Sequence, residues 1–388
     1  MGAVYAEPLV ARGRLVVATE SNRVYAFGAA TGEQRWRASL GAPVPSAEID
    51  AATSAGCSNI DPTGITGTPV VDRKAGVVYA AAMVREPIRH ELVALDLASG
   101  HTLWRRTVDP PGVDPRLYQQ RAALAVSSGR VYVAYGGTSG DCGDYKGTVV
   151  GTRTSGKGPL VVYSPPVRKG AGIWAPSGPA VGPGADLFVA TGNSDRPDFD
   201  YGDSVIRLTP GLRPVDFFAP ADNGWFNETD QDLGSVGPLL LPKHRAFIVG
   251  KSGDGFLLDA RHLGGIGHPV YRRDLGFDSY GGLAYADGSI FVPFRLAGVW
   301  GLRLDQTMSS FSVAWRGPVF RAGPPVVAGR AVWALDLDAG TLYAFGRRHG
   351  KVRFTGPVGA PAQFSTPTAA GGRVYVAAGG HVIAFGDG

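Results

Sequence analysis

Two residues in the middle of the chain have side chains that could hold a flat organic molecule. Trp174 follows the glycine-rich stretch Gly170-Ala171-Gly172, and the face of an indole ring can bind a planar conjugated molecule. Lys251 lies in the turn Gly250-Lys251-Ser252-Gly253, where its ammonium group can polarise a carbonyl oxygen. Packing between strands for Trp174 and a solvated turn for Lys251 are the alternative interpretations.

Oxygen donors lie close to these two residues in the sequence. Asn193 ends the segment Thr191-Gly192-Asn193, and Asp230 and Asp232 lie in Thr229-Asp230-Gln231-Asp232. Carboxamide and carboxylate oxygens are the ligands that Ca²⁺ prefers, and a carboxylate can also accept a proton as a general base. Asn and Asp are also frequent in tight turns, so a turn-forming role stays open for all three residues.

A repeated unit must position these side chains. Val24-Tyr25-Ala26-Phe27 returns in related form as Leu92-Val93-Ala94-Leu95, as Leu342-Tyr343-Ala344-Phe345 and as Val382-Ile383-Ala384-Phe385. Each unit has a Pro-Val-Val-like segment, two alternating strands separated by small residues, a glycine turn and a Trp-bearing strand. Alternation between glycine turns indicates strands, and four short strands per unit are typical of a propeller blade. We expect the tryptophans of the repeat to pack between blades.

Eight first-strand segments are predicted, so the fold class is all-β, an eight-bladed propeller of four-stranded antiparallel blades in one domain over residues 1–388. These segments lie near residues 7–11, 67–71, 121–126, 178–182, 236–241, 281–285, 323–327 and 366–369. Longer units carry insertions at 43–66, 138–147 and 194–203. Insertions in a propeller form rim loops, which commonly carry the binding face.

The last unit ends at its third strand, Val382–Phe385, and too little chain precedes Tyr5 to supply a fourth strand. Ring closure normally uses a strand from the opposite terminus, which avoids an exposed sheet edge. We therefore expect a shortened N-terminus from which a secretion leader has been removed.

Composition narrows the choice of partner. The chain of 388 residues has 57 glycines, 44% hydrophobic residues and a net charge of +5, which fits a turn-rich domain with a substantial core. Basic residues are scattered singly or in pairs such as Arg347-Arg348, and no basic run alternates with aromatic residues. This pattern favours a solvated surface over a nucleic-acid site. No stretch approaches the roughly 20 apolar residues of a membrane span.

The two cysteines, Cys57 and Cys142, lie in inserted glycine-rich loops of successive blades. Neither has a Cys or His at metal-ligand spacing, which argues against zinc. We predict one disulfide, which implies an oxidising compartment; two free thiols are the alternative. The sequence has no Cys-x-x-Cys-His motif for covalently bound haem.

Over essentially the whole chain the repeat resembles the pyrroloquinoline quinone (PQQ) propeller family. It is most similar to the polyvinyl alcohol dehydrogenase-like members of the quinoprotein alcohol dehydrogenases. The family also includes non-catalytic outer-membrane assembly lipoproteins, so the resemblance implies the fold and leaves the activity open.

Four segments resemble the dehydrogenase site. Gly170-Ala171-Gly172-Ile173-Trp174 is similar to a Gly-Gly-Gly-Thr-x-Trp segment, which implies Trp174 as the floor under the quinone. The Thr-Gly-Asn resemblance implies Asn193 as a Ca²⁺ ligand, and a Trp-Asp-x-Asp resemblance implies Asp230 or Asp232 as the base, with Asp230 also a metal ligand. The turn around Lys251 resembles one whose cation contacts the quinone oxygens.

One loop differs from the family pattern. Where the dehydrogenases place a Glu ligand of Ca²⁺, this chain has the loop 136–147, in which Asp141 or Asp144 could substitute. We take Asp144 as the third candidate metal ligand. The vicinal cysteine pair that caps the quinone in many members is absent here.

The resemblance therefore implies a quinoprotein-like oxidoreductase, secreted or periplasmic, that oxidises an alcohol or sugar with PQQ and Ca²⁺. Without haem, it would pass electrons to a separate acceptor. Two alternatives stay open: a cofactor-free propeller that acts as a binding or assembly module, and a pocket adapted to non-redox chemistry on a small molecule.

Overall fold

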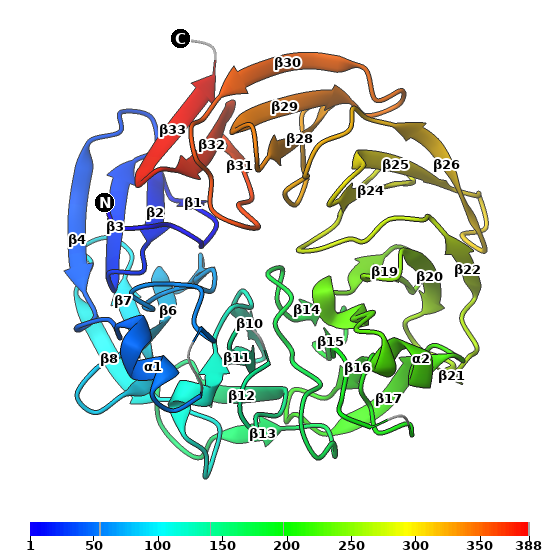
Figure 1. The fold of residues 1–388 in the computed structure, drawn as a ribbon. Helices are drawn as coiled ribbons and strands as arrows, with labels where there is room; N and C mark the ends of the chain where they lie inside the picture. The colour runs from blue at the N-terminus through cyan, green and yellow to red at the C-terminus, as the bar shows by residue number, and fades with distance from the viewer. Residues whose placement is uncertain (54–55, 140, 197, 387–388) are drawn as a thin grey trace.

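The computed structural model describes residues 1–53, 56–139, 141–196 and 198–386, and these form a ring of eight antiparallel sheets (Figure 1). The predicted all-β, eight-bladed propeller is confirmed. Seven sheets contain four or more strands, and the eighth contains three in the described part of the chain. No helix among the described residues is long and apolar enough to cross a membrane.

The first four blades contain strands β1 to β17, joined in the fourth by β21. Their bounds are β1 (Leu9–Ala11), β2 (Arg14–Ala18), β3 (Arg23–Gly28), β4 (Gln34–Ser39), β5 (Val70–Asp72), β6 (Val77–Val84), β7 (Arg89–Asp96), β8 (Thr102–Thr107), β9 (Tyr118–Gln119), β10 (Ala125–Ser127), β11 (Arg130–Gly137), β12 (Thr148–Arg153), β13 (Val161–Tyr163), β14 (Ala180–Val181), β15 (Leu187–Ala190), β16 (Val205–Leu208), β17 (Pro214–Ala219) and β21 (Gly265–Ile266).

The other four blades contain the remaining strands. Their bounds are β18 (Leu239–Leu241), β19 (Arg245–Val249), β20 (Asp254–Asp259), β22 (Tyr271–Asp274), β23 (Ala284–Ala286), β24 (Ser289–Phe294), β25 (Gly298–Leu304), β26 (Phe311–Arg316), β27 (Val326–Ala328), β28 (Ala331–Asp336), β29 (Thr341–Gly346), β30 (Val352–Pro357), β31 (Thr368–Ala370), β32 (Arg373–Ala378) and β33 (His381–Gly386). Short helical segments lie between blades: α1 (Ser46–Asp50), η1 (Pro115–Leu117), α2 (Asn223–Glu228) and η2 (Leu233–Ser235).

The first strands begin about three residues later than the sequence predicts. In the second blade, for example, the ladder starts at Val70 rather than near residue 67. The residues before it include Pro69, which has no backbone N–H to donate to a ladder. In this blade strand pairing therefore begins only after the proline.

Tryptophans of the fourth strands tie neighbouring blades together, as predicted. The indole Nε1 of Trp36 donates to Leu97 O at 3.0 Å, and that of Trp104 donates to Thr154 O at 3.0 Å. Each ring lies against a glycine of the next blade, Gly100 for Trp36 and Gly156 for Trp104, and both glycines have positive φ. A side chain at either glycine would overlap the ring, so turn and tryptophan specify each other.

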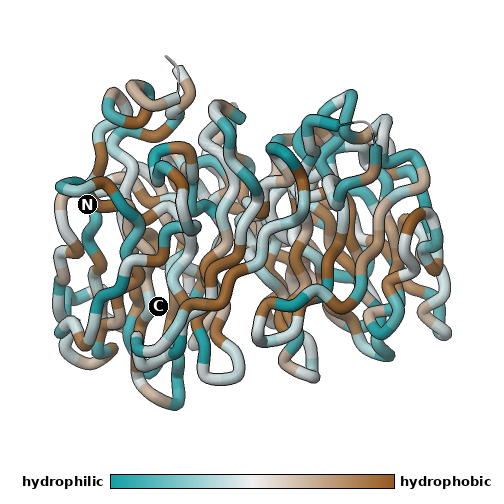
Figure 2. The backbone as a smooth tube through the Cα atoms, turned by 90° about the horizontal axis from the view of Figure 1, so that it is seen from below, coloured by the Kyte–Doolittle hydropathy of each residue, from teal (hydrophilic) through white to brown (hydrophobic). Residues whose placement is uncertain are grey.

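The eighth blade packs against the first and closes the ring. Tyr375 of β32 lies in one buried cluster with Val4, Leu15 and Val17, and its hydroxyl donates to Ala29 O at 2.8 Å. As expected from the short last unit, this sheet consists of β31, β32 and β33. Edge-on, the ring has hydrophobic segments in its middle and hydrophilic segments along its rims (Figure 2).

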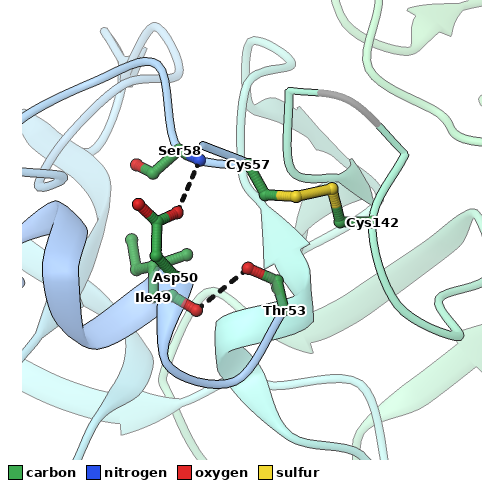
Figure 3. Close-up of a disulfide and its surroundings, with 6 residues drawn as sticks. All are labelled: Ile49, Asp50, Thr53, Cys57, Ser58 and Cys142. Atoms are coloured by element: carbon green, nitrogen blue, oxygen red, sulfur yellow. Dashed lines mark hydrogen bonds between the residues drawn. A yellow bond between two sulfur atoms is a disulfide. The ribbon is translucent and has the colours of Figure 1, made fainter. Parts of the chain in front are cut away.

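A disulfide joins Cys57 to Cys142, with the two Cα atoms 6.1 Å apart, and this confirms the predicted pair (Figure 3). It links the loop after β4 to the loop between β11 and β12. The first loop is also held internally, because Ser58 N donates to Asp50 Oδ1 at 2.9 Å and the Thr53 hydroxyl donates to Ile49 O at 3.1 Å. Both loops lie on the face that carries the pocket described below.

A carboxyl group is buried beneath the first of these loops. Glu20, only 2% exposed, accepts hydrogen bonds at Oε2 from Gly64 N at 2.7 Å and from the Thr66 hydroxyl at 3.1 Å. Burial raises the pKa of Glu20 from 4.5 to about 7, although these hydrogen bonds and the nearby Arg121 oppose the shift. Oε1 is buried without a partner among the described residues, as suits a protonated carboxyl group.

Replacing Cys57 and Cys142 together with serine should lower the free energy of unfolding by about 2–4 kcal/mol. The cross-link closes a loop of 85 residues, and its removal restores conformational entropy to the unfolded chain. Denaturant unfolding of the oxidised protein and the double variant measures the difference. Adding a reductant to the wild type should reproduce it, whereas equal midpoints for the two proteins would contradict it.

The buried Glu20 predicts a loss of stability as the pH rises. Because the folded state keeps this proton to about pH 7 while the unfolded state loses it near 4.5, the free energy of unfolding should fall by about 3 kcal/mol across that interval. Glu20→Gln should remove this part of the pH dependence in denaturant unfolding between pH 4.5 and 8. Exposed Glu33→Gln is the matched control, and parallel pH curves for all three proteins would refute the assignment.

Candidate functional site

A pocket of about 270 Å³ lies at the centre of one face of the ring. Its walls come from the connections that lead into the first strands and from the turns between second and third strands. Because these segments occupy the same end of every blade, residues distant in sequence meet here. The lining includes Tyr5, Asn59, Ile60, Arg121, Thr138, Ser139, Asp141, Trp174, Asp232, Ser235, Lys251, Tyr280 and Phe364.

Trp174 is half-buried and lines the pocket, where the resemblance places the floor for a planar ligand. Its indole rests on three glycines, Gly136, Gly172 and Gly192, and a methyl group at any of them would overlap the ring. Tyr145 supports the edge of this arrangement, with its ring centroid 6.4 Å from that of Trp174. These three glycines, here called the glycine bed, set the position of the indole ring and leave part of its surface open to the pocket.

Lys251 is the link between the two candidate bases. Its Nζ lies 2.7 Å from Asp230 Oδ1 and also pairs with Asp232 Oδ2. Asp232 is almost fully buried, whereas the Asp230 side chain is 65% exposed. A main-chain hydrogen bond also joins the two segments, because Lys251 N donates to Asp232 O at 3.1 Å.

The surroundings shift the proton affinities of this pair. Burial raises the pKa of the Asp232 carboxyl group, and the Lys251 ammonium group opposes that shift. Burial works against the charge of Lys251, but the Asp232 and Asp230 carboxylates outweigh it and raise the lysine pKa. Lys251 is therefore a permanent cation at neutral pH.

A third acid lies behind them. Asp203 is fully buried and accepts a hydrogen bond from Leu233 N at 2.8 Å. Burial, and then the nearby Asp232, raise its pKa well above the ordinary value. Its Oδ2 is buried without a hydrogen-bond partner in the described structure, as expected for a carboxyl group that keeps its proton.

These residues do not fit a Ca²⁺ ion. Asp232 already uses Oδ1 to accept from Asn193 N at 2.8 Å and Oδ2 to pair with Lys251. Asn193 thus contributes its main chain here, and Asp144 is exposed and lies outside the pocket lining. Within the described residues no group of three or more His, Cys, Asp or Glu side chains could hold a metal. A calcium ion would have to displace the lysine.

Sequence reasoning missed the other side of the pocket, which is built around Arg121. This residue is 8% exposed, and its Nη2 donates to Gln363 O at 2.9 Å. Its guanidinium lies 5.8 Å from the ring centroid of Tyr5 and 5.3 Å from that of Phe364. Burial lowers the pKa of Arg121 to about 10, with Glu20 opposing the shift. It lies at the start of the predicted first-strand segment 121–126, and no motif marked it as a pocket residue.

Comparison with solved structures shows the same fold in proteins of different activity. BamB from Moraxella catarrhalis matches with a TM-score of 0.66 and 15% identity, over 98% of this chain and 92% of that protein. A quinohemoprotein alcohol dehydrogenase from Comamonas testosteroni gives 0.68 and 16%, over 97% and 70%. A europium-containing methanol dehydrogenase gives 0.69 and 15%, over 97% and 83%.

Comparison of the sequence itself gives fewer matches than comparison of the fold. No curated protein sequence matches the chain. The sequence model of one family, a PQQ-type repeat family, matches residues 2–158 and 298–388, which together are more than half of the chain. The suspected resemblance to PQQ-type propellers is thereby confirmed. The chain belongs to the PQQ_2 family, which is described as outer membrane protein assembly factor BamB.

Proposed function

We propose that this protein binds a small planar, conjugated molecule in the Trp174 pocket and that the ammonium group of Lys251 supplies the cation beside that ligand. The observation that carries the proposal is the open indole face on its glycine bed, next to a lysine held by two carboxylates. A quinone such as PQQ belongs to this ligand class. The propeller would act in an oxidising compartment, as the disulfide requires.

The residues of the pocket would have different roles around such a ligand. Trp174 supplies the stacking surface, and Lys251 can donate a hydrogen bond from its ammonium group to a ligand carbonyl. Asp232, with a pKa raised by burial, can hold or accept a proton at Oδ2 when Lys251 turns toward the ligand. Arg121 gives the opposite wall a second cation. A quinone, when bound, would supply a two-electron acceptor.

An assembly role is the second candidate, and one observation favours it. The family model that matches the chain carries the description of an assembly factor. Under this alternative the pocket residues would be dispensable for function, and the rim loops would contact a protein partner.

Titration with PQQ, with and without Ca²⁺, tests the proposal. We expect saturable quenching of tryptophan fluorescence at micromolar cofactor, unchanged by Ca²⁺, because Lys251 occupies the position between the carboxylates. Trp174→Ala should weaken binding at least about tenfold, whereas Trp174→Phe keeps most of it. Trp225→Ala is the matched control, since Trp225 is exposed and outside this pocket.

Two results would decide against parts of this view. Absence of quinone uptake at micromolar concentration would reject the quinone, and equal affinity of the Trp174→Ala variant would reject the pocket. Dye-linked oxidation of an alcohol by the loaded protein, lost in Asp232→Asn, would add the redox activity to the binding role. Uptake without such turnover would restrict the protein to binding.

A further inference from the structure

A second concave site lies on the opposite face of the ring, between the sixth and seventh blades. Its residues come from turns between first and second strands, around 286–289 and 330, from β25, from the turn between β29 and β30, and from the start of β30. These turns are at the far end of the blades from the Trp174 pocket, because strands within each blade are antiparallel. The space measures about 690 Å³, within the range of small-molecule sites.

Positive charge converges on this groove, here called the arginine groove. Its cationic lining residues are Arg303, Arg330, Arg347, Arg348, Lys351 and Arg353. The one carboxylate among the described lining residues is Asp287. Six cations against one carboxylate give the groove the same formal excess, +5, as the whole chain. The rest of the molecule is therefore neutral on balance.

Most of these cations lack a counter-charge, in contrast to several arginines elsewhere in the described structure. Elsewhere Arg116, Arg207 and Arg245 each pair with an aspartate within 3.0 Å. In the groove Arg347 pairs with Asp287 at 3.0 Å, and within the described part of the chain the other five cations form no ion pair. Like charges held together without partners repel one another, so the arrangement does not stabilise the free protein.

The groove walls are firmly built. Arg303 Nη1 donates to Asp287 O at 2.8 Å and to Ser289 Oγ at 3.2 Å, which holds its guanidinium against the turn of the sixth blade. The opposite turn is closed by Gly346 N donating to Lys351 O at 2.8 Å. It is anchored to the core because the buried Trp315 donates from Nε1 to Arg347 O at 2.9 Å. The cations thus project from preformed turns.

We propose that the arginine groove binds a compact anion that carries two or more phosphate groups. A guanidinium group can form two parallel hydrogen bonds to phosphate oxygens. Cations that converge from two blades match a ligand with clustered charges better than they match a flat surface or an extended strand. The phosphates belong to a soluble polyphosphate or to a lipid headgroup. The site is separate from the Trp174 pocket, so it stands or falls independently of the proposed function.

Calorimetric titration of the full chain with sodium tripolyphosphate at low ionic strength tests this proposal. The exposed pair Arg348→Glu with Lys351→Glu should weaken binding at least about tenfold, and added salt should weaken wild-type binding as well. The matched control, Arg37→Glu with Lys157→Glu, makes the same charge change at exposed positions on distant blades and should leave affinity within about twofold of the wild type. Thermal unfolding of both variants confirms that each is folded.

Further arms separate the sources of phosphate. Cosedimentation with phosphatidylglycerol vesicles, lost in the groove variant and kept in the control, assigns the phosphates to lipid; binding of tripolyphosphate alone assigns them to a soluble anion. Equal losses in groove and control variants would overturn the proposal. So would absence of binding to both probes, or a preference for an RNA oligonucleotide over tripolyphosphate.

Discussion

Burial of both faces of every sheet against its neighbours is the constraint on which this molecule depends. A single blade cannot bury its own apolar faces and needs neighbouring repeats to cover them. Here the second strands, such as β6, are buried almost along their whole length. Each blade therefore needs the next, and the last needs the first. The tryptophan–glycine contacts between neighbouring blades and the hydrogen bond from Tyr375 to the first blade are the contacts that hold the blades together. Once the ring is closed, loops from several blades meet near its axis and form a common site.

The features of the fold that depend on local sequence patterns could be predicted from the sequence. Repeats such as Val24–Phe27 alternate with period two and end at glycine turns, so blade number and order followed directly. In the second blade the first-strand boundary was displaced because Pro69 has no backbone N–H to donate to a ladder. Trp174, Asp232 and Lys251 meet because equivalent loops of a propeller reach the same face, whatever their role.

What the sequence could not supply was the direction of each side chain in its loop. Asn193 offers a main-chain N–H to Asp232, and Asp144 lies outside the pocket, since these orientations depend on contacts made across blades. Arg121 escaped notice because a single arginine before a strand carries no pattern. By occupying the position between Asp230 and Asp232, Lys251 brings a covalently attached positive charge to the pocket.

The Cys57–Cys142 bond has a topological result apart from its contribution to stability. The 85-residue segment it spans contains the whole second blade and runs into the third, so this part of the ring is a closed covalent circle. A protease that cuts one peptide bond inside the circle leaves both fragments attached. The protein could therefore lose a peptide bond in its second blade and still present an unbroken ring, and only cleavage outside the circle would divide the chain.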